Sequence, residues 1–282
     1  MIQPIRAHFI KRKIFFLLVG LALLGFVSCE FFQFGNTDSN TATLKLSLTD
    51  APAPDVDEVW IDFGEVQVSQ ESSSTSDADA EWLVINSDGG SFDLLTLSNG
   101  AIQDLGIKDL APGQYNQIRL YVDSARVVVD ETSYDAQVNS DTIKLVRSFT
   151  LQAGVTTELI VDFNAGHSVK LTGNNQYRIT PVVKVTQADT TGGVNGTVTA
   201  APDVLITASA YAEYDASDAT LVPEGGTSVD ENGDFLIGYL DPGTYDIVIE
   251  ADGYEPEVFS DEEIVVGQVL PLGEIILTAA RS

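Results

Sequence analysis

The chain has 282 residues, of which 44% are hydrophobic, so it is long enough for one large or two modest domains and too apolar for wholesale disorder. Its 42 Asp and Glu residues outnumber its 14 Lys and Arg residues, which gives a formal net charge of −28. A surface this negative repels nucleic acid and anionic lipid headgroups and attracts cations, so the charge argues against nucleic-acid binding and is most simply explained by solubility in a salty or calcium-rich medium.

The N-terminus has the layout of a bacterial export signal. Four bases, Arg6, Lys11, Arg12 and Lys13, precede an uncharged apolar run over residues 14–27. That run is short for a membrane span but has the length of a signal-peptide core. Without these four bases the chain keeps ten bases against 42 acids, a net charge of −32.

The only cysteine of the chain, Cys29, directly follows the apolar run. The sequence Phe26-Val27-Ser28-Cys29 resembles the lipobox of bacterial lipoproteins, in which a small residue precedes a cysteine that receives a diacylglycerol group before cleavage. Ser28 and Cys29 fit this pattern, whereas Phe26 stands where Leu is usual. The alternative interpretation is an uncleaved membrane anchor with an incidental cysteine. An unpaired thiol is a liability outside the cytoplasm, and acylation gives it a use.

We therefore predict a signal peptide over residues 1–28, lipidation of Cys29 and a flexible tether over residues 29–42. The acyl chains would hold the protein on a membrane, because each buried methylene contributes roughly 0.8 kcal/mol. Lipoproteins that stay in the inner membrane of enteric bacteria usually carry Asp after the cysteine. This chain has Glu30 there, which favours the outer membrane, on its periplasmic or its surface face.

From Thr43 onward apolar and polar residues alternate, which is the period of half-buried strands. Only residues 99–110 hint at a helix, a short one, and the polar residues 71–80 are predicted to form a mobile loop tip. The predicted strands of this first block cover residues 44–48, 59–68, 82–86, 92–97, 118–122, 125–129, 143–149, 156–163 and 177–186.

Residues 187–193 (QADTTGG) are predicted to be a linker to a second series of strands. The pattern as a whole predicts an all-β fold of two β-sandwich domains in tandem, over residues 43–186 and 194–282. The predicted strands of the second block cover residues 194–198, 204–211, 234–239, 243–250, 257–259, 264–269 and 274–278.

Four segments of the second block form a characteristic series: residues 193–198 (GVNGTV), 230–235 (DENGDF), 240–246 (LDPGTYD) and 251–254 (ADGY). In this order they resemble the carboxypeptidase regulatory-like domains, which are small transthyretin-like sandwiches with an immunoglobulin-like outline. The resemblance implies a spacer, a stabiliser or a binding surface, and no peptidase activity.

The first block has its own series: residues 46–52 (LSLTDAP), 93–97 (DLLTL), 110–115 (LAPGQY), 117–120 (QIRL) and 177–181 (YRITP). These segments resemble the domain of unknown function 4382 of bacterial lipoproteins. The resemblance runs through the whole first block. It implies an all-β fold outside the cytoplasm and supplies no catalytic residue.

Catalytic side chains are scarce in the predicted mature chain. His167 is its only histidine, and no G-x-S-x-G nucleophile elbow accompanies it, whereas nucleophilic catalysis needs a base beside the nucleophile. One histidine and no free cysteine also argue against a zinc or copper site. Pairs of acids could hydrolyse a glycoside, but no spacing singles out one pair. We therefore predict no catalytic residue.

Ligation of Ca²⁺ by oxygen atoms stays open in so acidic a chain. Asp50, Asp55, Asp57 and Glu58 gather around a proline-rich turn and are the calcium candidate, against the simpler interpretation of a solvated acidic loop. Residues 230–234 (DENGD) also suggest a calcium loop. The glycine falls one position early there, so a hairpin turn is the better interpretation.

Two tryptophans are candidates for a sugar-binding platform. Trp60 occupies the polar phase of its strand, opposite to Val59 and Ile61, and is predicted to face outward. With Trp82 it could stack on sugar rings, although tryptophans in sandwiches more often pack in the core. Arg119 also has an outward phase, and an ion pair with a nearby Asp is the simplest prediction for it.

The sequence thus favours a non-enzymatic, lipid-anchored cell-envelope protein whose two sandwiches present a binding or structural surface, with Ca²⁺ as the one cofactor left open. The alternatives are a calcium-dependent adhesin or carbohydrate-binding module, and a carboxylate-based hydrolase. The expected partners are the membrane, through acyl chains on Cys29, and an envelope glycan or protein.

Overall fold

The computed structural model describes residues 40–70, 81–174, 176–199, 204–218 and 220–281. The predicted signal peptide, Cys29, most of the predicted tether and the predicted loop over residues 71–80 lie outside the described residues. Every described residue belongs to one compact unit. Within the described part, no helix combines the length and the apolar character that a membrane span requires.

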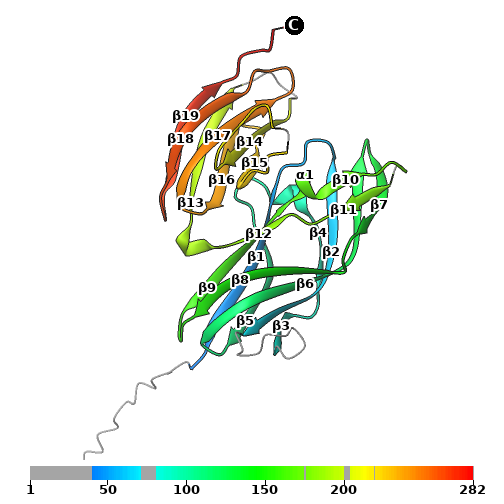
Figure 1. Cartoon of the computed structure of the whole chain (residues 1–282), viewed down its shortest axis with the longest axis vertical. Coiled ribbons are helices and arrows are strands. Elements are labelled where there is room, and N and C mark those ends of the chain that lie inside the picture. The colour runs from blue at the N-terminus through cyan, green and yellow to red at the C-terminus, as the bar shows by residue number, and fades with distance from the viewer. Residues whose placement is uncertain (1–39, 71–80, 175, 200–203, 219, 282) are drawn as a thin grey trace, which may run out of the picture. The chain divides into compact units, whose positions relative to one another are not determined.

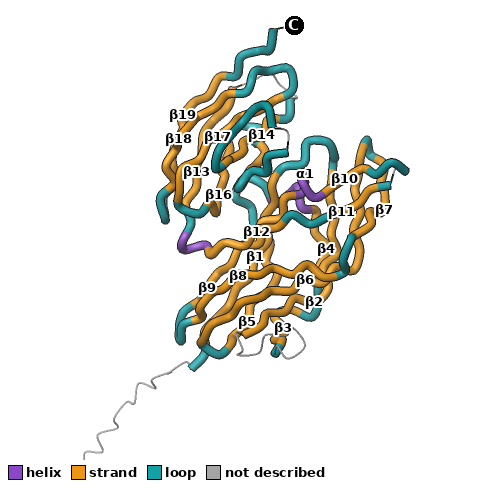
Figure 2. Tube along the Cα trace, viewed as in Figure 1, coloured by secondary structure: helices purple, strands orange, loops and turns teal. Residues whose placement is uncertain are grey.

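The described chain is mostly strand, joined by loops and turns, as Figure 2 shows. Its helical elements are η1 (Leu94–Leu97), α1 (Ala165–Ser168) and η2 (Ala188–Thr190), each a single turn. The strands are β1 (Ala42–Ala51), β2 (Glu58–Gln70), β3 (Trp82–Asn86), β4 (Gly90–Asp93), β5 (Gln103–Leu110), β6 (Gly113–Val129), β7 (Thr132–Val138), β8 (Thr142–Leu151), β9 (Thr156–Asn164), β10 (Val169–Leu171), β11 (Tyr177–Ile179), β12 (Val183–Gln187), β13 (Gly192–Thr199), β14 (Ile206–Tyr211), β15 (Gly225–Ser228), β16 (Asp234–Leu240), β17 (Gly243–Ala251), β18 (Glu257–Ile264) and β19 (Val269–Ile276).

The first sandwich packs two sheets, built from β1 to β12 (Figure 1). Sheet 1 has the strand order β12-β9-β1-β5, with β1 parallel to β9. Sheet 2 has the order β10-β11-β7-β6-β2-β3, with β4 added to β2 and β8 added to β6. The alternation in the sequence holds here, because Leu44, Leu46 and Leu48 of β1 are fully buried in the core that the two sheets enclose.

The second sandwich packs sheet 3, with the order β16-β13-β19, against sheet 4, with the order β15-β14-β17-β18. It has a hydrophobic core of its own, which includes Val194, Phe235 and Ile247. The predicted all-β fold with sandwiches in tandem is therefore confirmed. The chain passes from β12 to β13 through η2 and the buried Thr191, in the predicted linker.

The same turn precedes a long strand in each sandwich. The sequences Leu-Ala-Pro-Gly-Gln-Tyr and Leu-Asp-Pro-Gly-Thr-Tyr occupy residues 110–115 and 240–245. The Tyr115 hydroxyl donates to the carbonyl oxygen of Ala111 at 2.9 Å, and the Tyr245 hydroxyl donates to that of Asp241 at 2.9 Å. Both rings are buried in the core of their own sandwich. Each hydroxyl therefore anchors the preceding turn to that core, as in a tyrosine corner.

Residues 230–234 form a tight turn, but the predicted hairpin is wrong, because β15 before the turn pairs with β14 in sheet 4 and β16 after it pairs with β13 in sheet 3. The Asp230 carboxylate accepts hydrogen bonds from the backbone N–H groups of Asn232 and Asp234, both at 2.9 Å. Gly233 has a φ of +89°, and a Cβ atom there would lie 2.4 Å from the Val198 carbonyl oxygen. The turn therefore requires glycine for both conformation and space.

Four predicted elements were wrong. The strand predicted over residues 177–186 is two strands, β11 of sheet 2 and β12 of sheet 1, separated at residues 180–182. The helix suggested over residues 99–110 is largely strand β5, because pairing with β1 buries Leu105 and overrides local preference. The strand predicted over residues 92–97 ends at Asp93, whose carboxylate caps the turn of η1 by accepting from Leu95 N–H at 3.3 Å. The strand predicted over residues 264–269 is a turn between β18 and β19.

Candidate functional site

The structure disperses the four acids of the predicted calcium site. Asp55 and Asp57 are exposed in the loop before β2, and Glu58 accepts a hydrogen bond from Trp60 Nε1 at 2.6 Å. Asp50 is instead buried at the end of β1, where its Oδ1 accepts from Ala165 N–H at 2.9 Å. Among the described residues no three His, Cys, Asp or Glu side chains come together in a group that could hold a metal.

The two tryptophans lie at opposite ends of β2 on the outer face of sheet 2. Trp60 belongs to β2 itself, whereas Trp82 is paired with Ser69 at the far end of that strand. Nine residues of strand separate the two positions by about 30 Å, so the rings form no common platform. Arg119 lies over the Trp82 ring at 3.6 Å from its centre, and Arg126 lies over the Trp60 ring at 4.3 Å. Each ring thus stacks on an arginine in this structure.

The outer face of sheet 1 meets the second sandwich through polar contacts. Lys184 of β12 forms ion pairs with Glu224 at 2.8 Å and with Asp241 at 3.5 Å. The Asn99 N–H, in the loop before β5, donates to the Thr227 hydroxyl of β15 at 2.6 Å. These contacts join the two sandwiches, and we call this region the junction.

His167 contributes to the junction. Its Nδ1 lies 3.1 Å from Asn164 Oδ1 in the first sandwich, and its Nε2 lies 3.2 Å from the Leu221 carbonyl oxygen in the second. Both ring nitrogens therefore face oxygen atoms of the protein. In this geometry the histidine connects α1 of the first sandwich to the loop that contains Leu221 in the second, and neither ring nitrogen is directed at a nucleophile.

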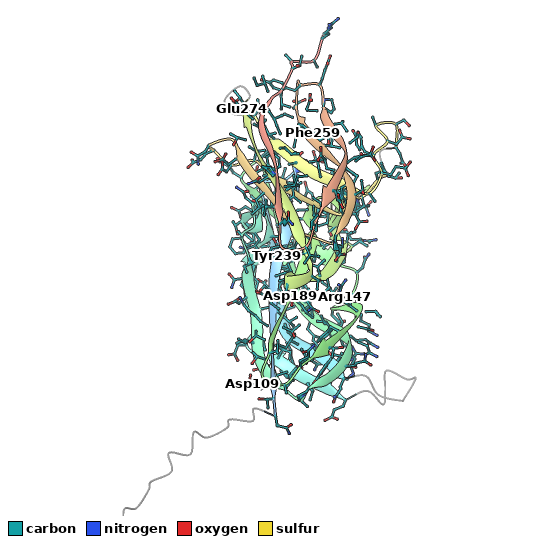
Figure 3. The ribbon with its side chains drawn as sticks, turned by 90° about the vertical axis from the view of Figure 1, so that its left-hand side faces the viewer. Asp109, Arg147, Asp189, Tyr239, Phe259 and Glu274 are labelled. Atoms are coloured by element: carbon teal, nitrogen blue, oxygen red, sulfur yellow. The ribbon has the colours of Figure 1, made fainter. Side chains whose placement is uncertain are left out.

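A small enclosed cavity of about 10 Å³ lies in the junction. Asp50 and Asp162 line it from β1 and β9, and Tyr239 lines it from β16 of the second sandwich. Figure 3 shows Tyr239 between Asp109 of β5 and Phe259 of β18. Burial and the nearby Glu158 raise the pKa of Tyr239, so this tyrosine lies close to the acids of sheet 1.

The two carboxyl groups of the cavity resist ionisation. Burial raises the pKa of Asp50 well above its ordinary value, and the charge of Asp162 adds to the rise. Burial also raises the pKa of Asp162, to about 6, against the opposing charge of Lys184. Asp50 Oδ2 is a buried atom with no hydrogen-bond partner among the described residues. The junction therefore holds acid groups that the protein leaves without full compensation.

Sequence reasoning did not single out Asp162. It predicted residues 156–163 as a half-buried strand, whereas β9 is covered on both faces: Val161 and Phe163 lie in the core, and Ile160 is buried against the other side. The sequence signal that could have identified Asp162 is an acid within a hydrophobic run, since charged residues are rarely buried without a role or a partner.

A larger groove of about 700 Å³ lies beside the junction. Pro54 and Asp55 line it from the first sandwich, and Leu205, Tyr254 and Glu250 are among the residues that line it from the second. Its wall combines apolar side chains with the carboxylates of Asp55, Glu250 and Asp252. Sequence reasoning missed it because its residues come from distant parts of the chain.

Comparison with known proteins identifies one family. The family described as "Domain of unknown function (DUF4382)" matches residues 41–181, half of the chain. No curated protein matches the chain.

Among solved structures, the TIE protein of Bacillus anthracis is 12% identical, with a TM-score of 0.22; the match covers 85% of this chain and 34% of that protein, so this chain spans about a third of its length. The minor pilin GBS52 of Streptococcus agalactiae is 11% identical, with 84% and 97% coverage and a TM-score of 0.22. The shaft pilin SpaA of Lactobacillus rhamnosus GG is 12% identical, with 86% and 99% coverage and a TM-score of 0.24. Likenesses this weak carry no functional argument.

Proposed function

The chain belongs to the DUF4382 family, and from that premise we propose that it is a non-enzymatic, lipid-anchored protein of the cell envelope whose two sandwiches present a binding surface. The observation that carries this proposal is the position of Cys29. The only thiol of the chain directly follows a basic segment and an apolar run, at the one place where a cysteine is acylated during export.

The second sandwich suits the role of a spacer. We propose that residues 194–282 are a carboxypeptidase regulatory-like domain, which the tight turn at Gly233 and the tyrosine corner at Tyr245 support. Its contacts with the first sandwich at Lys184 and Asn99 favour a fixed arrangement of the two modules over free rotation. If the two sandwiches keep a fixed arrangement, a binding surface formed by residues of both keeps its shape.

The groove beside the junction is the surface we propose for binding. Tyr254 offers an aromatic ring, and Asp55 and Glu250 offer hydrogen-bond acceptors, a combination suited to an envelope glycan or to a basic protein segment. The strongly negative net charge favours ligands without anionic groups.

Metabolic labelling tests the anchor. The full chain is expressed in a bacterial host with an alkyne fatty acid and compared with Cys29→Ala, with Gln33→Ala as a control in the predicted tether. We expect wild type and Gln33→Ala to be labelled and to fractionate with the outer membrane, and Cys29→Ala to be unlabelled with residues 1–28 retained. Equal labelling of Cys29→Ala, or an unlabelled wild type in the cytosol, would overturn the proposal.

A further inference from the structure

The bases of this acidic chain are unevenly placed. Residues 30–282 contain ten Lys and Arg residues against 42 Asp and Glu residues, so most bases would be expected to have acids as neighbours. Four of the ten instead face one another in sheet 2. Arg119 of β6 is directly opposite Lys144 of β8, and Lys170 of β10 is directly opposite Arg178 of β11. We call these the two cationic pairs.

Both cationic pairs lie on the outer face of sheet 2. Ile118 is fully buried next to Arg119, and Ile179 is fully buried next to Arg178. Successive side chains of a strand point to opposite faces, so the two arginines point away from the core. The lysines share that face, because residues directly opposite each other in an antiparallel pair point the same way. The strands of the second pair, β10 and β11, lie beside β7 (Figure 1).

This arrangement is unfavourable for the free protein, because like charges directly opposite each other destabilise a sheet. Within the part of the chain that the structure describes, neither Lys170 nor Arg178 forms an ion pair. Arg126, on the same face, has the opposite surroundings: it lies across from Asp135 and stacks on the Trp60 ring. An anion bound between the two members of a cationic pair would replace their repulsion with attraction.

From this placement we propose that the outer face of sheet 2 binds an anionic glycan, a sugar chain with acid groups on successive units, through the two cationic pairs. An acid group can accept charge-assisted hydrogen bonds from both members of a pair. Because β7 lies between β6 and β11, Arg119 and Arg178 are about 10 Å or more apart. A single small anion cannot reach both pairs. Successive charges of one chain can, and binding at two places strengthens the whole.

The negative net charge of the chain does not prevent such binding. The Debye length at physiological salt is about 8 Å, so a group in contact with a pair experiences the local charges rather than distant acids. A flat anionic membrane would also meet the exposed acids of this face, such as Asp123 and Asp135, which a narrow sugar chain can avoid. Trp82, on which Arg119 stacks, adds an apolar contact for a sugar ring. The surface lies wholly on sheet 2, so this inference is independent of the groove and of the lipid anchor.

Titration of the full chain in detergent with sugar polymers, at about 0.15 M NaCl to screen the net charge, tests the surface. Dextran sulfate and polygalacturonate are the anionic probes, and neutral dextran is the reference. We expect wild type to bind both anionic polymers and not dextran. Lys144→Gln should bind them more weakly, and the double variant Lys170→Gln, Arg178→Gln about tenfold more weakly or worse. Without polymer the double variant should melt at or above the wild-type temperature, because it lacks one contact between like charges.

Lys108→Gln combined with Arg281→Gln is the matched control. It also removes two exposed bases, but Lys108 belongs to β5 of sheet 1 and Arg281 follows β19 of the second sandwich. It should bind the anionic polymers as wild type does. Failure of wild type to bind either anionic polymer, equal binding of dextran, or equal losses in the control and in Lys170→Gln, Arg178→Gln would each overturn the proposal. So would tighter binding of the unacylated Cys29→Ala chain to phosphatidylglycerol vesicles than to the polymers, because the face would then contact a membrane.

Discussion

At the scale of single residues, the outer face of sheet 2 contains one acid with unusually good hydrogen bonding. Asp62 accepts hydrogen bonds from the hydroxyls of Ser124 and Ser91, and these bonds, the one from Ser124 first, lower its pKa below the ordinary value. Because the folded pKa lies below the unfolded one, the bonds stabilise the fold above about pH 4, and this contribution is lost as the pH falls through the folded pKa.

Ser124→Ala should therefore raise the pKa of Asp62 towards its ordinary value. The variant should be less stable than wild type at pH 7, by an amount that shrinks as Asp62 becomes protonated. NMR titration of the carboxyl group measures the first effect, and denaturant unfolding at several pH values measures the second. Ser87→Ala, in an exposed turn, is the control. An unchanged Asp62 pKa in Ser124→Ala would contradict the assignment.

At the scale of elements, the repeated turn provides the sharpest comparison. Tyr115→Phe and Tyr245→Phe each delete one hydroxyl and with it one partly buried hydrogen bond, so each should lower the free energy of unfolding by about 0.5–1.5 kcal/mol. Tyr134→Phe, at a partly exposed ring of β7, should change it by less than about 0.5 kcal/mol. Denaturant unfolding measures all three. If neither Tyr115→Phe nor Tyr245→Phe lowered the free energy of unfolding by more than Tyr134→Phe does, the two hydroxyls would not stabilise their turns.

The strands that the sequence predicted well are those with one buried face. In β2, Val59, Ile61 and Phe63 are buried and alternate with residues that are less buried. Only one face of sheet 2 packs on the core, so a period of two residues is visible in the sequence. Strand β7 was missed because most of its residues are exposed, so no hydrophobic alternation marks it. Pairing with β6 rather than its own composition makes it a strand.

The candidate site was predictable only in part. Asp50 was singled out for its place in an acidic turn, whereas Asp162 is distant in the chain and is brought opposite Thr49 by the parallel pairing of β1 with β9. The groove beside the junction depends on contacts between two sandwiches. Local periodicity carries no information on such contacts, which follow from the packing of whole sheets.

At the scale of the whole molecule, two separate cores are joined by a polar junction. Such a junction couples the unfolding of the two sandwiches only as strongly as its hydrogen bonds and ion pairs allow. Lys184 is central, because it is half-buried and lies between Glu224 and Asp241. Without Lys184, the three acids around it, Glu224, Asp241 and Asp162, would have no base between them.

Lys184→Met should therefore separate the unfolding of the two sandwiches. We expect calorimetry to show one transition for wild type, and two transitions or a clear broadening for Lys184→Met combined with Thr227→Val, which also removes the acceptor of the Asn99 N–H. Lys45→Met combined with the same Thr227→Val is the matched control. Lys45 likewise lies between two acids, Asp104 and Glu158, but both belong to the first sandwich.

The Lys45→Met, Thr227→Val variant should thus lose a similar ion-pair contribution, about 1 kcal/mol or less for pairs this exposed, while the two sandwiches still unfold together. The comparison isolates the position of the lysine from its charge, because both variants remove one base from an acidic chain. A single sharp transition in the Lys184→Met, Thr227→Val variant would mean that apolar packing between the sandwiches, rather than the ion pairs, makes them unfold as one.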